Sequence, residues 1–385
     1  MSAADASSIR DLKAAARRYL PRIIFDYIEG GAEDELGIDR NRAAFEAIEL
    51  MPRYLVDVSR VNRAVELFGT RYAAPFGIAP TGMAAIARHD ADGLLARAAH
   101  EASIPFILSG AGNASTERIA EVAPSAWYQL YIPKKRELRE DLVRRAADAG
   151  IGTLVVTIDV PIYSKRERDV RNGWVRPYNP KWPAKLEAMR HPAWLISYLR
   201  RGIPHLENWQ AYAPPGTRPV DVATTYGEQS FAVQTWDTLA EIRAQWPGKL
   251  VLKGVLSPDD AALACAAGVD GVIVSNHGGR QLDKAPAAIA ALPAVVDADA
   301  GRMPVMVDSG IMRGSDIVAG LALGASFVFV GRATLYAVAA YGLPGVERAI
   351  AILETEIELA LKSIGCPDVA DLNRNCIHAA PGLQR

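Results

Sequence analysis

Eight short apolar runs, each bounded by turn residues, recur along this chain. They occupy residues 75–80, 105–109, 127–131, 153–159, 250–255, 271–276, 305–310 and 327–331. Most are followed by an alanine-rich amphipathic stretch of helical period, such as ADGLLARAAHEA or GSDIVAGLALG. Eight repeats of strand then helix predict an α/β fold, a (β/α)8 TIM barrel, over about residues 70–345.

The segments outside the barrel have no core of their own. Residues 7–65 have the pattern of two or three helices, and LPGVERAIAILETEIELALKSIG, from Leu343, predicts one long amphipathic helix after the barrel. We expect both to pack on the barrel, so that residues 1–385 form a single domain.

Composition excludes several classes of function. The chain has 43 basic and 44 acidic residues, so no overall charge favours nucleic acid as a partner. Its three cysteines fit neither a disulfide framework nor metal-ligand spacing, and the strand ends offer no paired histidines, so we expect no metal site. The N-terminus has no signal-peptide core and no window is apolar enough to span a bilayer. We therefore expect a cytoplasmic protein, or one peripheral to a membrane.

One insertion, about residues 174–230, interrupts the alternation of predicted strands and helices between the fourth and fifth apolar runs. Its part Trp174–Tyr212 holds six Lys or Arg against two Glu, together with four of the seven tryptophans. One interpretation is a mobile lid with incidental tryptophans. The other is an interfacial segment, with HPAWLISYLRRGIPH at a lipid surface and basic residues on anionic headgroups.

Polar residues gather where the predicted strands end, which is where barrel enzymes carry their sites. The sixth run ends in SNHGGRQLD, which supplies a titratable base, His277, and a fixed cation, Arg280. The alternative for His277 is a helix-entry turn in which it only packs. Lys253 has three interpretations that spacing leaves open: a Schiff-base lysine, an anion stabiliser or a structural residue. Glycines and arginines after the last two runs predict a phosphate site.

SNHGGRQLD, YQLY, TIDVP, LKGV, DSG and LPRIIFDYIEGGAEDE together resemble the FMN-dependent 2-hydroxy-acid dehydrogenase and oxidase family. The resemblance covers nearly the whole chain and is greatest to the membrane-associated (S)-mandelate dehydrogenase type. It implies an enzyme that uses FMN to oxidise a 2-hydroxy acid to a 2-keto acid.

The resemblance also implies roles for residues. His277 is the base and Asp159 its partner, Tyr131 contacts the substrate hydroxyl, and Lys253 lies beside the flavin N1/O2 edge. The substrate carboxylate is held by Tyr27, Arg166 and Arg280. The residues expected to contact FMN, besides Lys253, are Ala79, Thr81, Ser109, Gln129, Thr157, Ser275, Asp308, Gly310, Arg313, Gly331 and Arg332.

The chain departs from the family pattern at Met312, where an arginine usually contacts the phosphate. Arg313 is the candidate replacement, and the sequence leaves open whether it reaches the phosphate; we expect FMN to be held more weakly than usual. Gly82 and Ala111 are small where oxidases of the family carry larger residues, which predicts a bulky substrate such as an (S)-mandelate-like acid.

The resemblance further implies a homotetramer, peripheral on the inner face of the cell membrane, that passes electrons to a quinone. The alternatives within the family are an O2-dependent oxidase and an L-lactate dehydrogenase. Outside it, the alternatives are a flavin barrel isomerase and a sugar-phosphate lyase using Lys253, against which the two carboxylate-binding arginines beside His277 argue, and a non-catalytic binding barrel.

Overall fold

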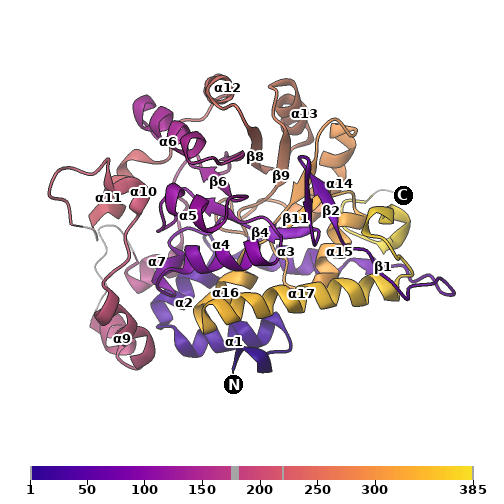
Figure 1. Cartoon of the computed structure of the whole chain (residues 1–385), viewed down its shortest axis with the longest axis horizontal. Helices are drawn as coiled ribbons and strands as arrows, with labels where there is room; N and C mark the ends of the chain where they lie inside the picture. The colour runs from indigo at the N-terminus through magenta and orange to yellow at the C-terminus, as the bar shows by residue number, and fades with distance from the viewer. Residues whose placement is uncertain (1, 175–181, 219–220, 384–385) are drawn as a thin grey trace.

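Eight parallel strands surround the centre of the molecule in the computed structural model, which describes residues 2–174, 182–218 and 221–383 (Figure 1). Neighbouring strands follow the order β4-β11-β10-β9-β8-β7-β6-β5, and a parallel bridge between Ile78 and Phe106 joins the two ends of this series. All eight predicted strands and the TIM barrel are confirmed. The strands are β4 (Phe76–Ile78), β5 (Ile107–Ser109), β6 (Trp127–Leu130), β7 (Thr153–Thr157), β8 (Lys249–Val255), β9 (Gly271–Val274), β10 (Val305–Val307) and β11 (Phe327–Val330).

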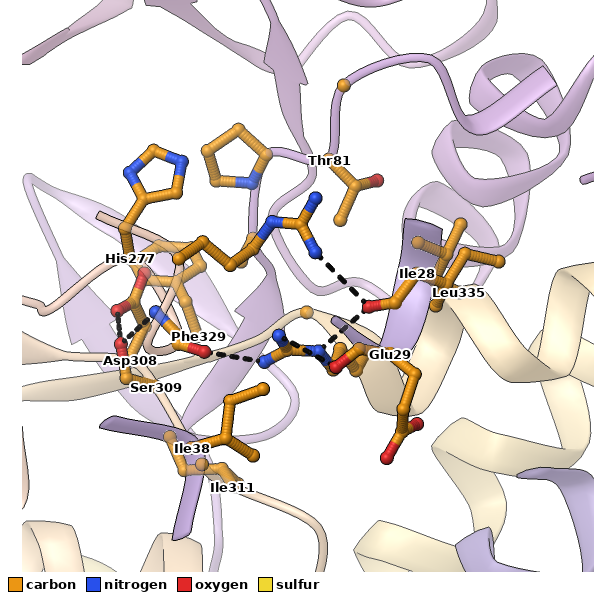
Figure 2. A pocket seen from close by; sticks show the side chains of 18 of the residues that line it. Ile28, Glu29, Ile38, Thr81, His277, Asp308, Ser309, Ile311, Phe329 and Leu335 are labelled. Carbon is orange, nitrogen blue, oxygen red and sulfur yellow. Dashed lines mark hydrogen bonds between the residues drawn. The ribbon is translucent and has the colours of Figure 1, made fainter. Parts of the chain in front are cut away.

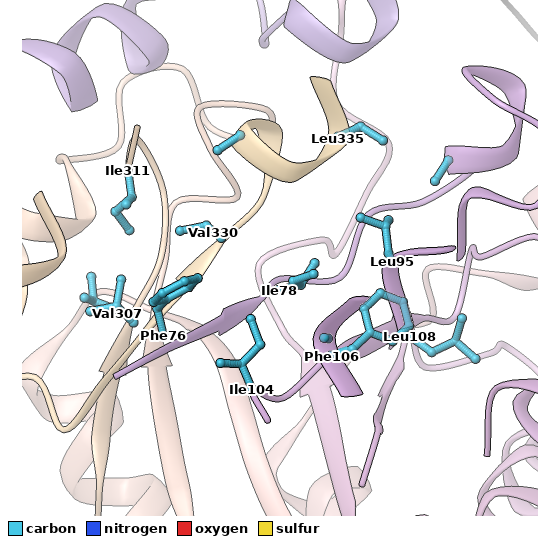
Figure 3. Close-up of a cluster of buried hydrophobic side chains, with 14 of the residues drawn as sticks. Phe76, Ile78, Leu95, Ile104, Phe106, Leu108, Val307, Ile311, Val330 and Leu335 are labelled. Atoms are coloured by element: carbon cyan, nitrogen blue, oxygen red, sulfur yellow. The ribbon is translucent and has the colours of Figure 1, made fainter. Parts of the chain in front are cut away.

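Each barrel strand is followed by one helix of the outer ring. Because both faces of each strand are covered, the strand sequences are almost continuously apolar rather than alternating. Figure 3 shows part of the core between strands and helices, including Phe76, Ile78 and Leu95. The ring helices are α4 (Ala91–Glu101), α5 (Thr116–Val122), α6 (Arg136–Asp148), α12 (Trp236–Gln245), α13 (Pro258–Ala266), α14 (Ala288–Asp299), α15 (Gly314–Ala322) and α16 (Arg332–Tyr341).

A short hairpin fills the end of the barrel where the strands begin. It consists of β2 (Val65–Leu67) and β3 (Thr70–Tyr72), which pair antiparallel. Its Phe68 ring lies 5.7 Å from that of Trp127, and Tyr72 lies 5.6 Å from Phe327 inside the barrel. With this end filled, the strand carboxyl ends are the open side.

The flanking segments pack on the barrel as expected. Three α-helices precede it, and the N-terminal helix α1 packs against α16, while the long C-terminal helix packs against α15 and α16. Two short strands that the sequence pattern did not predict pair antiparallel between the two flanks. The flanking elements are α1 (Ile9–Tyr19), α2 (Arg22–Glu29), α3 (Leu36–Glu46), α17 (Leu343–Ser363), β1 (Glu49–Leu50), β12 (Ile377–Ala379) and the 3-10 helices η1 (Ala3–Asp5), η4 (Val369–Asp371) and η5 (Arg374–Cys376); η2 (Ala84–Ile86) follows β4.

The predicted insertion is largely helical. It contains α8 (Trp182–Ala188), α9 (Pro192–Arg201), α10 (Glu207–Gln210) and α11 (Val222–Gln229), after α7 (Glu167–Asn172). Residues 175–181 and 219–220 of the prediction lie outside the described residues. Figure 1 shows α9 at one edge of the molecule, at the lower left.

Three of the four tryptophans of this insertion pack on the rest of the protein rather than face outward. Trp194 donates its indole N–H to the carbonyl of Ile86 (3.0 Å), and buried Trp209 donates to that of Gly110 (2.9 Å). The Trp174 ring lies 5.2 Å from that of Tyr27. An indole N–H needs an acceptor when it is buried, and the barrel loops supply one. Trp182 does face outward, with 74% of its surface exposed.

Candidate active site

A cavity of about 340 Å³ opens at the carboxyl ends of the strands, within the size range of small-ligand sites (Figure 2). The barrel loops line it on one side, and α2 and α3 line it on the other. Most of the predicted site residues line it: Tyr27, Ala79, Thr81, Gly82, Tyr131, Thr157, Lys253, His277, Arg280, Asp308, Gly310, Gly331 and Arg332. The convergence expected from the strand ends is therefore observed.

His277 is held by two groups, one on each ring nitrogen. Its Nδ1 lies 2.9 Å from Asp159 Oδ1, and its Nε2 lies 3.4 Å from the Tyr131 hydroxyl at the cavity. A carboxylate can only accept, so Nδ1 carries the proton and Nε2 presents a lone pair. His277 has a left-handed backbone (φ 57°), and its N–H donates to Ser275 Oγ (3.0 Å). This strained turn fixes the direction of the ring.

Two opposing effects set the protonation of this pair: Asp159 raises the pKa of His277, and burial lowers it. Burial lowers the pKa of His277, and this effect exceeds the opposing effect of the Asp159 carboxylate. Burial acts to raise the pKa of Asp159, but the contact with His277 and the charge of Lys253 hold it below its usual range. The resting pair is a neutral imidazole beside a carboxylate, which is a base ready to accept a proton.

Tyr131 keeps its hydroxyl proton, because burial raises its pKa well above the usual range. It can therefore donate a hydrogen bond to a substrate oxygen. Its ring also contacts Phe231, at 5.9 Å, from the segment between α11 and α12. Phe231 has a φ of 67°, which is costly for a bulky residue, and its ring contacts Tyr163 as well. Sequence reasoning missed Phe231 because nothing in its surroundings predicts a turn at the active site.

Lys253 provides a buried positive charge. Its ammonium lies 3.0 Å from Asp308 Oδ2 and donates to Ser275 Oγ at 2.8 Å. Burial alone would lower the pKa of Lys253, but Asp308 and Asp159 raise it above its ordinary value. Of the three interpretations of this lysine, the anion stabiliser fits best, since a Schiff-base lysine must lose its proton.

The carboxylate end of the site is built around Arg280. Its Nη1 donates to the carbonyls of Tyr27 (2.8 Å) and Gly30 (2.7 Å), and its guanidinium lies over the Tyr27 ring. Burial and the nearby Arg166 lower the pKa of Arg280 to about 9, which leaves it charged at neutral pH. A buried cation whose hydrogen bonds go to neutral carbonyls is stabilised by an incoming anion.

Two predicted arginines do not line the cavity. Arg166 donates from Nε to Ser164 Oγ (3.2 Å) and lies over the Tyr163 ring, although its charge still lowers the pKa of His277. Arg313 is the N-cap of α15, is half exposed and pairs with Glu356 at 2.6 Å. The expectation that Arg313 replaces the missing phosphate arginine is therefore wrong, because a carboxylate of α17 already holds its guanidinium. Met312 lines the cavity in its place.

Several buried polar atoms around the barrel mouth have no hydrogen-bond partner in the described structure. Among them are Thr81 Oγ1, Thr157 Oγ1 and Gln129 Nε2; Gln129 Oε1 instead accepts from Ser109 Oγ (3.1 Å). Buried polar groups are nearly always satisfied, so these atoms indicate a ligand with polar edges that lies across the strand ends.

The wall near Tyr27 is lined by small residues. Gly82 lines the cavity, and a methyl group at its position would come within 3.0 Å of Ala111 Cβ. Ala111 itself lies behind Gly82 rather than on the cavity surface. Gly82 forms the part of this wall beside Tyr27, whose hydroxyl donates to the Gly82 carbonyl at 3.4 Å.

The fold and the site define a class of protein: a (β/α)8-barrel enzyme with a neutral base, a buried cation and a guanidinium that awaits an anion. The family model for FMN-dependent dehydrogenase matches residues 16–379. The chain belongs to the FMN-dependent dehydrogenase family, and it is an FMN-dependent 2-hydroxy-acid dehydrogenase.

Known relatives agree with this assignment over almost the whole chain. (S)-mandelate dehydrogenase of Pseudomonas putida is 41% identical over 95% of this chain and 92% of its own length. An L-lactate dehydrogenase of Ectopseudomonas mendocina is 39% identical over 96% of this chain and 98% of its own. A crystal structure of the monotopic membrane protein (S)-mandelate dehydrogenase superposes with a TM-score of 0.93 at 40% identity, over 97% of this chain and 99% of that one.

The residues present fit FMN. The unpartnered Thr81, Thr157 and Gln129 atoms match the polar edge of a flavin ring, and the Lys253 cation can stabilise its anionic reduced form. Gly331 and Arg332 begin α16, where main-chain N–H groups favour a phosphate. Bound FMN supplies the two-electron acceptor for the oxidation.

Proposed function

We propose that this enzyme oxidises an (S)-2-hydroxy acid with a bulky side chain, such as mandelate, to the 2-keto acid. The observation that carries this substrate class is Gly82, which lines the cavity without a side chain and has the small Ala111 behind it. Space beside an apolar wall favours an aromatic or long side chain over glycolate. The similarity to mandelate dehydrogenases supports the same substrate, and L-lactate is the second candidate.

The residues act on this substrate as follows. Arg280 and the Tyr27 hydroxyl bind the carboxylate, and Tyr131 donates to the C2 oxygen. Oxidation breaks the C2–H and O–H bonds, and two electrons and two protons leave in all. His277 accepts one of these protons at Nε2, and Asp159 stabilises the imidazolium that results, since the two side chains are 2.9 Å apart.

One experiment tests cofactor, reaction and substrate together. The yellow protein is mixed without oxygen with (S)- and (R)-mandelate, L-lactate and glycolate, and the flavin absorbance is followed. We expect (S)-mandelate to bleach the flavin with the highest kcat/KM. A higher kcat/KM for glycolate or lactate would overturn the bulky-substrate proposal. Hydrogen peroxide formed in air in equal amount to product would identify an oxidase.

The same proposal places α8 and α9 on the inner face of the cell membrane, with the electrons passing to a quinone. Support comes from exposed apolar side chains: Trp182, Leu186, Met189, Ile196, Leu199 and Ile203. Lys185, Arg190, Arg200 and Arg201 lie among them and suit anionic lipid. Within the described residues, none of the helices has the length and apolarity to cross a bilayer.

A homotetramer is part of the proposal, and light scattering after gel filtration tests it.

A further inference from the structure

One face of helix α3 forms part of the cavity wall. Ile38, Asp39 and Arg42 all line the cavity, and their spacing places them on one side of the helix. Figure 2 shows Ile38 in the same part of the cavity as Ile311, which belongs to the loop after β10. This side of the cavity is therefore the end predicted to hold a phosphate.

Arg42 differs from the other cations of the cavity in having no partner. Lys13 pairs with Glu29, Lys253 with Asp308, and Arg168 with Glu35. Arg280 donates to the carbonyls of Tyr27 and Gly30, and Arg332 donates to those of Ile28, Gly278 and Gly30. In the part of the chain that the structure describes, Arg42 has neither a hydrogen bond nor an ion pair. The exposed Arg42 guanidinium therefore has all its N–H donors available, whereas Arg280 already uses Nη1.

The position of α3 brings Arg42 to the loop after β10. A methyl group at Gly310 would lie 3.0 Å from Asn41 Cβ and 3.3 Å from the Phe45 ring, so this helix packs directly on that loop. Arg42 follows Asn41 on this helix and lines the same cavity as Gly310 and Met312. The loop itself offers no free cation, because Met312 is neutral and Arg313 pairs with Glu356.

We propose that Arg42 binds the phosphate of FMN and supplies from α3 the guanidinium that position 312 lacks. A planar guanidinium can make two parallel hydrogen bonds to phosphate oxygens, and the N-terminus of α16 approaches the same end of the cavity. Asp39, one turn earlier on the same face, also lines the cavity, and its carboxylate repels a phosphate. The positive charge of Arg42 offsets this repulsion. Without Arg42, a carboxylate rather than a cation lines this end of α3. The proposal rests on FMN as the cofactor and not on the identity of the substrate.

The test compares FMN with riboflavin, which lacks the phosphate. Holoenzyme is diluted and the released flavin is measured by its fluorescence; the flavin-free protein is then titrated with each flavin. We expect Arg42→Gln to lower the affinity for FMN about ten- to a hundredfold, which is the range for losing a hydrogen bond to a charged group. The affinity for riboflavin should be unchanged. Arg10→Gln, an exposed arginine of α1 outside the cavity, is the control and should change neither.

Two further variants separate a phosphate contact from a structural role. Arg42→Lys keeps the positive charge but lacks the two parallel donors of a guanidinium, so it should lose less FMN affinity than Arg42→Gln. Adding Met312→Arg to Arg42→Gln should restore FMN affinity. Equal losses for FMN and riboflavin, or no loss for FMN, would overturn the proposal. If none of the tested hydroxy acids bleaches the flavin while FMN stays bound, only the proposed substrate is contradicted and the role of Arg42 is not.

Discussion

At the scale of single residues, the site depends on a base that is kept neutral by burial. His277 sits between Asp159 and Tyr131 with its Nε2 toward the cavity, and its pKa is lowered because burial penalises the charged form. Lys253 stays protonated a short distance away because Asp308 and Asp159 raise its pKa. Two neighbouring groups are thus held in opposite protonation states, one to accept a proton and one to stabilise negative charge.

The first prediction concerns the pH dependence of this base. Neutral His277 is the active form, so kcat/KM should fall as the pH drops through its pKa in the free enzyme, which lies below the ordinary 6.5. Asp159 raises this pKa, so Asp159→Asn should move the acid limb to lower pH and also lower kcat. His277→Gln should lower kcat by about 10²- to 10⁴-fold with the flavin content unchanged.

Steady-state rates between pH 5 and 9, with bound flavin measured by absorbance, check these expectations. An acid limb that stays in His277→Gln, or that lies above pH 6.5 in the wild type, would assign the titration to another group.

The second prediction concerns Gly82. A methyl at this position comes within 3.0 Å of Ala111 Cβ, so Gly82→Ala should push the wall into the substrate space. We expect kcat/KM for mandelate to fall about tenfold or more, the usual cost of one misplaced methyl, and that for lactate to change much less. Gly152→Ala is the matched control, because a methyl there meets nothing within 4 Å. Equal losses for both acids would contradict the size argument.

At the scale of elements, helix α9 has two unlike faces. Trp194 and Tyr198 point inward and donate to the carbonyls of Ile86 and Ala85 in the loop after β4. Ile196 and Leu199 point outward and are 45% and 77% exposed. The inward face fixes the helix to a loop that also carries Gly82, and the outward face supplies the apolar surface proposed to contact lipid.

The third prediction tests that outward face. Replacing Leu199 with Glu removes an apolar anchor and adds a negative charge, so binding to anionic phospholipid vesicles should weaken at least about tenfold. Activity with a soluble dye should be unchanged, since Leu199 is remote from the cavity lining. Leu359→Glu, at a 59% exposed position on α17, is the control. Sedimentation with vesicles measures both variants, and undiminished binding of Leu199→Glu would exclude this face.

The elements differ in how far the sequence predicts them. The eight strands follow from apolar runs bounded by turns, and the site residues follow from the strand ends, because parallel strands bring those ends together. The strands of the hairpin β2–β3 and of the pair β1–β12 read VEL, TRY, EL and IHA, so they lack the continuous apolar run that marks the barrel strands. The direction of Arg313 depends on Glu356 in α17, which spacing cannot reveal, and that of Arg166 on local contacts with Ser164 and Tyr163. Arg42 is a site candidate only once α3 is known to cover the cavity.

At the scale of the whole molecule, the cavity lies between the barrel and the N-terminal helices. Arg280 and Arg332 of the barrel donate to carbonyls at the end of α2, and Ala32 N–H donates to the carbonyl of Gly279. Lys13 of α1 and Tyr336 of α16 both contact Glu29 of α2. The cavity is lined by residues of both parts, which supports the proposal that residues 1–385 form a single domain.

The last prediction follows from that arrangement. FMN that binds the folded protein alone should raise the free energy of unfolding by about 2.7 kcal/mol at a free concentration of a hundred times its Kd. Because the cavity joins barrel and flanks, thermal unfolding should show one transition whose Tm rises with FMN. Scanning calorimetry of holoenzyme and flavin-free protein over a range of FMN concentrations measures this. Two transitions, of which FMN moves only one, would show that the N-terminal helices fold as a separate unit and that the cavity does not couple them to the barrel.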